Sequence, residues 1–510
     1  MSRSVYLRVL MCWLLAVATS SAQKSIRVQV VIDRGPDYGQ SFGSLFEGTT
    51  ADGNFVIGAG FPNAYNTRYR ANRHSVQFFI RPVHGNRPLK VKQLPRPTDN
   101  LTGAYLFERA GSIYSTYGGL QRWDADSGVW QPTQDSGGTN ESMRLANGLL
   151  TFGDSQVTWN DRVILSPPLE GTYELFFYAN GHLCFYHVNR KDGPYRQYTS
   201  DKDGFSRLYA VPWTPDEKTV DLSKAVTFQL PVVGETTFAW GQLRDQVVTG
   251  SNIGGFYRFQ KGRWDKLLEP DMTRSYQLYS SLGFGDRLLM GQYPTGRLFE
   301  YDGTQIRDLS DWPPVPPGVR GSAREAQTTC IYGGQLFAGV WPWGELWRYA
   351  PDSDSWTLDR RMFNHPAVSD SVTHPYDKEN AGNVPQNKWG QRVTSLVPHG
   401  KSLFISTSAK APYKWEPGSY PFLQPSLWKS YGNVFQATMP GHVSVPVHWT
   451  DGATTLIFEV VNGQMRISQD GRLLVSAAAD EFASDVDDLK WGDGIFGPHA
   501  CRSLRGQIQD

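Results

Sequence analysis

A long connection between two strand-rich segments carries the residue types best suited to acid–base catalysis. It runs from Asp359 to Gly390 and holds His365, His374 and Tyr376, and Arg392 follows directly after it. A His or Tyr side chain can take up and return a proton, and an Arg can neutralise a carboxylate. These types suit removal of a proton next to a carboxylate, the reaction of a lyase acting on uronate polysaccharides. The alternative is a solvated loop whose histidines have no partner.

A second set of residues could hold such a substrate. The candidates are Arg70, Arg73, His74, Arg258, Trp343 and Trp389. The first three lie in the Arg- and Tyr-rich stretch Tyr65–His74, and guanidinium forks match carboxylate or sulfate groups. Exposed indole faces stack on sugar rings. The alternatives are hydrated charges on an exposed loop and plain packing of the indole rings.

No metal or cofactor is expected for catalysis, although structural calcium stays an open option. Three Asp pairs could supply the hard oxygen ligands that calcium prefers. They are Asp124 with Asp126, Asp201 with Asp203, and Asp352 with Asp354. Each pair also falls in a predicted hairpin turn, where Asp is favoured without any ion.

The elements that must position these residues follow from an internal repeat between Gly285 and Leu358. Leu288, Gly291, Pro294, Gly296, Leu298 and Tyr301 match Leu336, Gly339, Pro342, Gly344, Leu346 and Tyr349 without a gap. Each copy predicts short antiparallel strands joined by Gly/Pro turns, and one such sheet cannot bury both of its faces alone. We therefore predict an all-β fold, a β-propeller of seven blades within a range of six to eight.

The ends of the chain predict further strands. Ser25–Ile32 alternates apolar and polar residues, and we expect it to close the ring beside the last blade. The strands around the turn at Asp52-Gly53, together with His74–Pro82, are expected to form a first blade. The domain prediction is a propeller over 23–430 and a C-terminal β region over 431–510. That region is either a lectin-like module or sheets that complete the ring.

One repeat resembles a known family. Glu345–Met362, preceded by Gly333-Gly334, is similar to a kelch repeat, with its Gly pair, apolar strand, aromatic residue and later Trp. The resemblance implies the propeller fold. It implies no activity, because propellers serve as enzymes, adaptors and binding proteins alike.

Composition and the N-terminus bear on location and partners. With 50 Lys and Arg against 49 Asp and Glu, net charge gives no support for nucleic-acid binding. Arg3 and Arg8 precede an apolar run that ends in small residues at Ala22, which predicts a signal peptide over 1–22. The expectation is a secreted or periplasmic monomer without a membrane span, bound to a polysaccharide or glycan.

We therefore interpret the chain as an exported, carbohydrate-active propeller, either a polysaccharide lyase on acidic glycans or a glycoside hydrolase. The alternative is a non-catalytic propeller that binds glycans or proteins.

Overall fold

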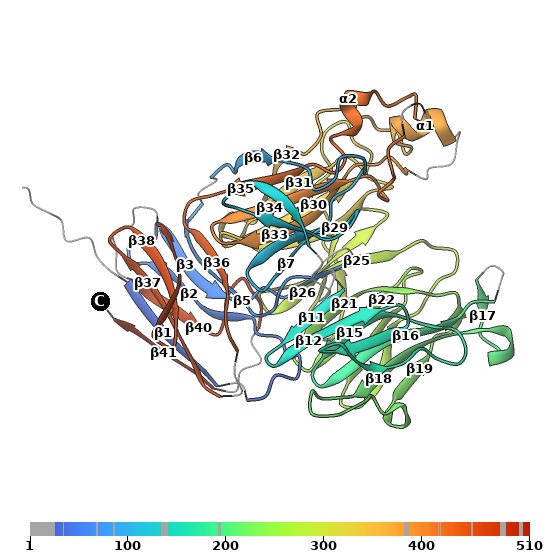
Figure 1. Ribbon diagram of the computed structural model, residues 1–510, viewed down its shortest axis with the longest axis horizontal. Coiled ribbons are helices and arrows are strands. Elements are labelled where there is room, and N and C mark those ends of the chain that lie inside the picture. The colour runs from blue at the N-terminus through green and yellow to red at the C-terminus, as the bar shows by residue number, and fades with distance from the viewer. Residues whose placement is uncertain are drawn as a thin grey trace, which may run out of the picture.

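The computed structural model confirms the all-β prediction (Figure 1). It describes residues 26–33, 35–67, 70–84, 87–133, 141–191, 195–381, 387–416, 418, 420–449, 452–479, 486–498 and 503–509. The predicted signal peptide at 1–22 lies outside the described residues. The α-helices within these ranges are short: α1 (Pro375–Ala381) and α2 (Pro425–Trp428).

Seven antiparallel sheets place four strands in an up-and-down order. Four of them are β7 (Leu106–Arg109), β8 (Ser112–Ser115), β9 (Gln121–Asp124), β10 (Val129–Pro132); β11 (Ser142–Leu145), β12 (Gly148–Gly153), β13 (Gln156–Trp159), β14 (Arg162–Leu165); β15 (Thr172–Ala179), β16 (His182–Asn189), β18 (Phe205–Pro212), β19 (Val226–Gln229); and β21 (Thr237–Leu243), β22 (Gln246–Ser251), β23 (Phe256–Gln260), β24 (Arg263–Leu268). The other three are β25 (Gln277–Phe284), β26 (Arg287–Tyr293), β27 (Leu298–Tyr301), β28 (Ile306–Asp308); β29 (Glu325–Tyr332), β30 (Gln335–Trp341), β31 (Glu345–Ala350), β32 (Ser355–Arg361); and β33 (Arg392–His399), β34 (Ser402–Ser408), β35 (Val434–Thr438), β6 (Lys90–Leu94). A small pair, β17 (Arg196–Gln197) and β20 (Val232–Val233), stands apart.

The first strands of these sheets lie side by side, as expected for a propeller. Contacts run from β7 to β33, from β33 to β29, from β29 to β25, from β25 to β21 and from β21 to β15. Radial packing of this kind lets neighbouring sheets bury their facing sides against each other. The chain is therefore a β-propeller, and its closure into a ring of seven blades stays a prediction.

The internal repeat corresponds to two neighbouring sheets with the same register. Leu288 pairs with Tyr301 in the first copy, and Leu336 pairs with Tyr349 in the second. Gly344 has a φ of +60°, and a Cβ atom there would lie 2.5 Å from the Phe363 ring. The spacing shared by the two copies thus reflects their common strand pairing and a turn whose backbone conformation and close contact require glycine.

Ring closure is where the sequence analysis was wrong. The strand expected to close the ring, β1 (Ile26–Asp33), pairs with β37 (Thr454–Val461) and β41 (Ser503–Gln509) instead. The strand that completes the last propeller sheet is β6, which pairs with β35 and places Leu94 opposite Val434. The error arose because alternation marks a strand but not its partner.

Both ends of the chain build a separate β-sandwich, at the left of Figure 1. One sheet combines β1, β37 and β41 with β38 (Gln464–Gln469) and β39 (Arg472–Ala478). The other combines β2 (Ser44–Thr50), β3 (Phe55–Gly60), β5 (Ser75–Pro82), β36 (His442–Pro446) and β40 (Val486–Trp491). A single apolar cluster, including Val30, Phe78 and Phe458, fills the space between them. The strands expected to form a first blade therefore belong to the sandwich, whereas the domain boundary at 430/431 stays a prediction.

The loop between β3 and β5 leaves the sandwich and enters the propeller. Within it, β4 (Ala64–Asn66) adds a fifth strand to the sheet of β25. The described residues of this loop, 61–67 and 70–74, are called the axial segment. Within it, β4 contacts β21, β25 and β29, so the axial segment packs against the first strands of several propeller sheets.

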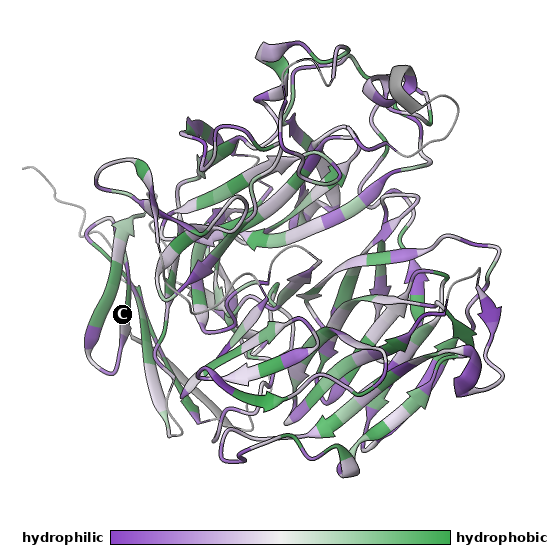
Figure 2. Cartoon of the chain, turned by 45° about the vertical axis from the view of Figure 1, so that its right-hand side comes forward, coloured by the Kyte–Doolittle hydropathy of each residue, from purple (hydrophilic) through white to green (hydrophobic). Residues whose placement is uncertain are grey.

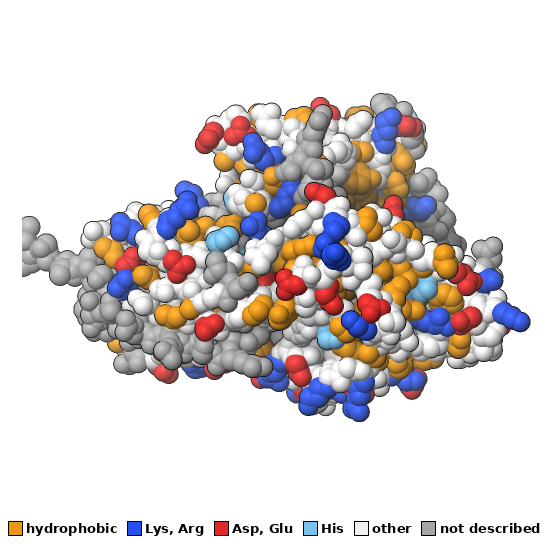
Figure 3. Space-filling view, turned by 60° about the horizontal axis from the view of Figure 1, so that its bottom comes forward, with side chains coloured by type: hydrophobic (Ala, Val, Ile, Leu, Met, Phe, Trp, Pro, Cys, Tyr) orange, Lys and Arg blue, Asp and Glu red, His pale blue; other side chains and the backbone are white. Residues whose placement is uncertain are grey.

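The surface and the strands show how polarity is distributed. Apolar residues concentrate within the strands in Figure 2, and acidic and basic side chains are interspersed on the face drawn in Figure 3. This mixing agrees with the balanced charge of the chain. Among the described residues, helices are too short and too polar to cross a membrane.

The β6 strand provides a direct test of how the last propeller sheet is completed. Leu94 is 4% exposed and packs between sheets, while Lys92 on the same strand is exposed. We expect Leu94→Ala to lower the free energy of unfolding by about 2–5 kcal/mol. Lys92→Ala should change it by less than about 0.5 kcal/mol. Equal effects of the two substitutions in denaturant titrations would contradict the placement of β6.

Candidate functional site

The predicted connection from 359 to 390 begins inside the last residues of β32 and leads to β33, and it lies with α1 and α2 at the top of Figure 1. Several of its contacts anchor it to the propeller. The backbone N–H of Trp389 donates to Asp377 over 2.8 Å, and the Tyr431 hydroxyl donates to the carbonyl of Trp389 over 2.7 Å. Trp389 itself is buried in an aromatic cluster with Tyr420 and Phe422. The described part of this connection is therefore a packed element of the fold.

His365 and Tyr376 meet within this connection. The Tyr376 hydroxyl lies 2.6 Å from Nδ1 of His365, and Nε2 of His365 lies 2.8 Å from Oγ of Ser430. Ser430 in turn donates its hydroxyl proton to the carbonyl of Leu427 over 2.6 Å. With the Ser430 proton assigned to Leu427, we assign the histidine proton to Nε2, and Nδ1 then accepts from Tyr376. The backbone carbonyl of Leu427 is a further hydrogen-bond acceptor for His365. The bonds thus form one directed chain from Tyr376 to Leu427.

Arg361 is the positive charge beside this pair. Its side chain donates to the carbonyls of Trp343 and Pro366, each over 3.1 Å, and to Oε1 of Gln391 over 3.3 Å. All of these acceptors are neutral. The acid whose charge raises the pKa of Arg361, Glu345, is itself paired with the buried Arg324. Among the residues that the structure describes, Arg361 has no ion-pair partner of its own.

The pKa shifts in this group favour neutral side chains. Burial, assisted by the charge of Arg361, lowers the pKa of His365 below its ordinary value, so its imidazole is neutral at pH 7. Burial raises the pKa of Tyr376 to about 12, although Arg361 opposes that rise. At neutral pH the site therefore holds a protonated phenol, a neutral imidazole whose Nδ1 lone pair accepts from that phenol, and a guanidinium.

His374 joins the group as a packing residue. Its ring lies 4.9 Å from that of Trp343 and 5.4 Å from that of Tyr376, and it is 1% exposed. Burial lowers its pKa to about 3. Its backbone N–H donates to Asn387 over 2.6 Å, which fixes the start of α1. His374 thus supports Tyr376 and has no access to solvent.

Arg392, the fourth predicted catalytic residue, does not join the group. It is 2% exposed, and one of its nitrogens donates to both oxygens of Glu325 over 3.0 Å. It also donates to the carbonyl of Lys410 and lies over the Trp341 ring. A buried carboxylate already neutralises it, so the arginine beside the His–Tyr pair is Arg361.

Three predicted substrate-binding residues do not lie where a sugar beside His365 would reach them: two are buried, and the third lies elsewhere. Trp343 and Trp389 are each 2% exposed, so neither offers a face to a sugar ring. Trp343 packs on His374 instead. Arg258 on β23 pairs with Asp265 over 2.8 Å, outside the group around His365.

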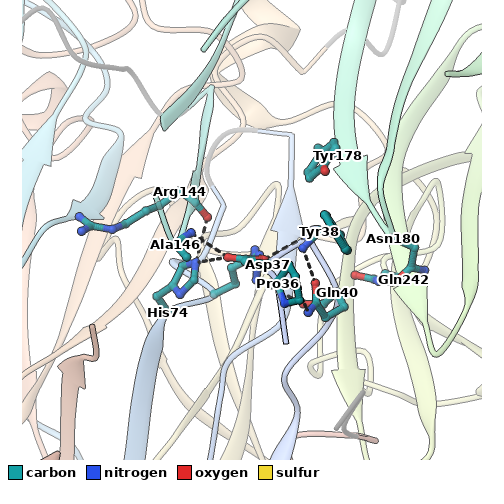
Figure 4. Close-up of polar contacts among 12 residues, drawn as sticks. Pro36, Asp37, Tyr38, Gln40, His74, Arg144, Ala146, Tyr178, Asn180 and Gln242 are labelled. Carbon is teal, nitrogen blue, oxygen red and sulfur yellow. Dashed lines mark hydrogen bonds and ion pairs between the residues drawn. The ribbon is translucent and has the colours of Figure 1, made fainter. Parts of the chain in front are cut away.

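The remaining three, Arg70, Arg73 and His74, belong to the axial segment. Arg73 and His74 both pair with Asp37, and a carboxylate oxygen of Asp37 lies 3.1 Å from Nε2 of His74 (Figure 4). Further contacts reach β11 and its end, where Asp37 accepts from the backbone N–H of Ala146 and Nε2 of His74 lies near the carbonyl of Arg144. These residues tie three segments together, and Asp37 was not noticed in the sequence.

The predicted calcium ligands make the hydrogen bonds of ordinary turns. Asp124 accepts from the backbone of Asp126 and the hydroxyl of Ser127, and Asp203 accepts from Ser200. Asp352 pairs with Arg81. Within the described ranges, no three His, Cys, Asp or Glu side chains gather closely enough to hold a metal ion.

Sequence reasoning missed two members of the candidate site. Arg361 ends β32 and falls within the predicted connection 359–390, next to Arg360, and nothing in the sequence distinguishes the two arginines. Ser430 lies 65 residues from His365, and only the fold brings them together. Alternation along β32 offers a partial signal for choosing between Arg360 and Arg361, because neighbouring residues in a strand point to opposite faces.

Comparison with known proteins gives no family. No protein-family model and no curated protein sequence matches this chain. Among solved structures, the computationally designed protein Ika8 is similar at 10% identity over 79% of this chain and 100% of its own, with a TM-score of 0.35. YCF48 bound to a D1 peptide is similar at 13% over 69% and 98%, with a TM-score of 0.35. A GH74 xyloglucanase from Xanthomonas campestris reaches 14% over 63% and 53%, with a TM-score of 0.23. Likeness of this degree says nothing about activity, and the kelch resemblance is not supported by a family match.

The Asp37 contacts predict how stability depends on pH. Burial lowers the pKa of His74 to about 4, with Arg73 adding to the effect. Burial alone would raise the pKa of Asp37, but Arg73 and His74 outweigh it and lower that pKa. Both groups bind protons more readily when unfolded, so stability falls as the pH is lowered.

We expect His74 to contribute up to about 1.4 kcal/mol per pH unit between its unfolded pKa, near 6.5, and about 4. Denaturant titrations at several pH values measure this slope. The variant His74→Gln should be less stable at pH 7 and should show a shallower slope in that window. An unchanged slope would contradict a neutral, buried His74.

Proposed function

We propose that this protein cleaves acidic polysaccharides by β-elimination, with His365, Tyr376 and Arg361 forming the site. The observation that carries the proposal is the directed chain of hydrogen bonds from Tyr376 through His365 and Ser430, beside an arginine that lacks an ion-pair partner among the described residues. A neutral imidazole that accepts from a phenol can receive its proton, and a free guanidinium can hold a carboxylate.

Arg361 would bind the carboxylate of a uronate residue. In β-elimination the hydrogen on the carbon next to that carboxylate must leave as a proton, and negative charge spreads onto the carboxylate oxygens. A guanidinium beside the carboxylate stabilises this charge. Nε and Nη2 of Arg361 already donate within the protein, so Nη1 would be the nitrogen that donates to the substrate. Because the other acceptors of Arg361 are neutral carbonyl groups, its positive charge stays available to the substrate.

Tyr376 would exchange the proton. Its oxygen takes the proton from the carbon while its own proton passes to Nδ1 of His365, which is then held by Ser430 as an imidazolium. The bond between the neighbouring carbon and the glycosidic oxygen breaks, and a carbon–carbon double bond forms. The leaving oxygen then takes the proton from Tyr376, and His365 returns its proton to the phenol. The proton removed from the carbon ends on the leaving oxygen, and no oxidant or further reactant is needed.

The predicted signal peptide supports export to a place where such polymers occur, although 1–22 lies outside the described residues. A non-catalytic glycan-binding propeller is the second candidate, and one observation favours it. Tyr376 continues into a row of partly exposed rings, with Phe422 at 6.1 Å and Tyr420 next to it. Such a row could hold a sugar chain without chemistry.

The lyase and the non-catalytic binding protein predict different results for the variant Tyr376→Phe. We expect this variant to lose at least about a hundredfold in kcat on an acidic polysaccharide, because it removes the exchanging proton but leaves the ring. The unsaturated uronate absorbs ultraviolet light, so product formation can be followed directly. His365→Gln should lose a similar amount.

Binding of the same polymer should be nearly unchanged in Tyr376→Phe and weakened in Arg361→Gln. Tyr38→Phe is the matched control, since Tyr38 is 38% exposed and lies in the loop before β2. If the native protein binds uronate polymers but releases no unsaturated product, the non-catalytic candidate holds.

The pH profile of kcat/KM provides a separate test. Elimination requires a neutral His365, and burial lowers the pKa of His365 below 6.5. Activity should therefore persist at pH 6.5 and decline only at lower pH. An acid limb centred above pH 6.5 would contradict the buried, neutral imidazole.

A further inference from the structure

The axial segment borders a cavity that the proposed function does not use. Its walls come from the axial segment, from Phe42, and from the first strands of five propeller sheets, β7, β11, β15, β21 and β25. The cavity provides about 80 Å³ for the centres of water-sized molecules. At one water for each 10–15 Å³, this corresponds to a ligand of about five to eight non-hydrogen atoms.

Arg70 brings a guanidinium to this cavity, and one of its nitrogens lacks a hydrogen-bond partner although the side chain also interacts with the Tyr65 hydroxyl. Its guanidinium lies between the rings of Tyr65 and Phe152, 4.9 Å from each centroid, and its Nη2 donates to the carbonyl of Phe176 over 2.9 Å. Its Nη1 is buried and has no hydrogen-bond partner among the described residues. Burying a hydrogen-bond donor without an acceptor costs free energy, so native proteins rarely leave a buried donor unpaired.

The charges around the cavity are predominantly positive. Arg70, Arg73, Arg109 and Arg144 line it, and Glu108 is the one acid among the described lining residues. Arg73 is already paired with Asp37. The oxygens of Glu108 accept from Asn72 over 2.7 Å and from the backbone of Gly111 over 2.6 Å, so they do not occupy Arg70.

The rest of the wall is apolar. Phe177 and Trp240 stack in parallel with centroids 6.0 Å apart, and Met143 and Leu149 lie on β11 and β12. A ligand that fits must therefore place an anionic end at Arg70 and a short apolar body against these side chains.

We propose that this cavity is a binding site for a small organic carboxylate held by Arg70. The carboxylate accepts from Nη1, and its hydrocarbon part replaces water beside Phe177 and Met143. This inference is independent of the elimination chemistry at His365, because it uses a different cavity and different residues.

The test follows the methyl signals of selectively labelled methionine in the full chain by NMR. Butyrate and butyramide are suitable probes, because they have the same shape and differ in charge. Butyrate should shift the Met143 signal saturably, and butyramide should bind at least about tenfold more weakly. Met439, buried in another cluster, is the internal reference and should not move. The substitution Met143→Leu assigns the signal.

The variant Arg70→Gln should weaken butyrate binding by at least about tenfold, whereas Arg258→Gln, a half-buried arginine outside the cavity, should leave it unchanged. If Arg70→Gln does not fold, the butyrate and butyramide titrations of the native protein still test the proposal. The proposal is overturned if butyrate causes no saturable shift, if butyramide binds equally well, or if a folded Arg70→Gln binds like the native protein. Equal binding of inorganic sulfate would overturn the assignment to organic carboxylates.

Discussion

Each propeller sheet has two apolar faces, and the need to keep both out of water governs the structure. The clusters that satisfy this need lie between sheets. One of them joins Tyr186, Trp240 and Met290, which come from three successive sheets. Another joins Tyr332 and Ile405 of the last two sheets with Trp389 and Tyr431 of the long connections. The packing that holds the sheets together thus also fixes the segment that carries His365 and Tyr376.

This shared packing gives the candidate site its geometry. The His–Tyr bond needs two loop residues to keep a fixed orientation, and loops seldom do so without support. Here, Trp389 and Asp377 hold the end of the connection, His374 packs behind Tyr376, and Ser430 follows α2 in the chain. The arginine that completes the group, Arg361, lies at the end of β32, so a strand positions its charge.

The sequence predicted the repeated sheets well, because strand pairing leaves a pattern in Leu288, Gly291 and Tyr301 that recurs in the next sheet. It could not predict which strands pair across long distances. The register of β1 with β37 and of β6 with β35 depends on the assembled core. In the same way, His365 and Tyr376 were close enough in sequence to be grouped, whereas Arg392 was grouped wrongly because its partner Glu325 lies far along the chain.

The central claim is that His365 receives its hydrogen bond from Tyr376 and gives one to Ser430. Nitrogen-15 NMR of the two ring nitrogens of His365 at neutral pH tests this claim most directly. The structure predicts a proton on Nε2, a bare Nδ1, and no positive charge on the ring. A proton on Nδ1, or an imidazolium at neutral pH, would contradict the directed chain and remove the basis for proton exchange at Tyr376.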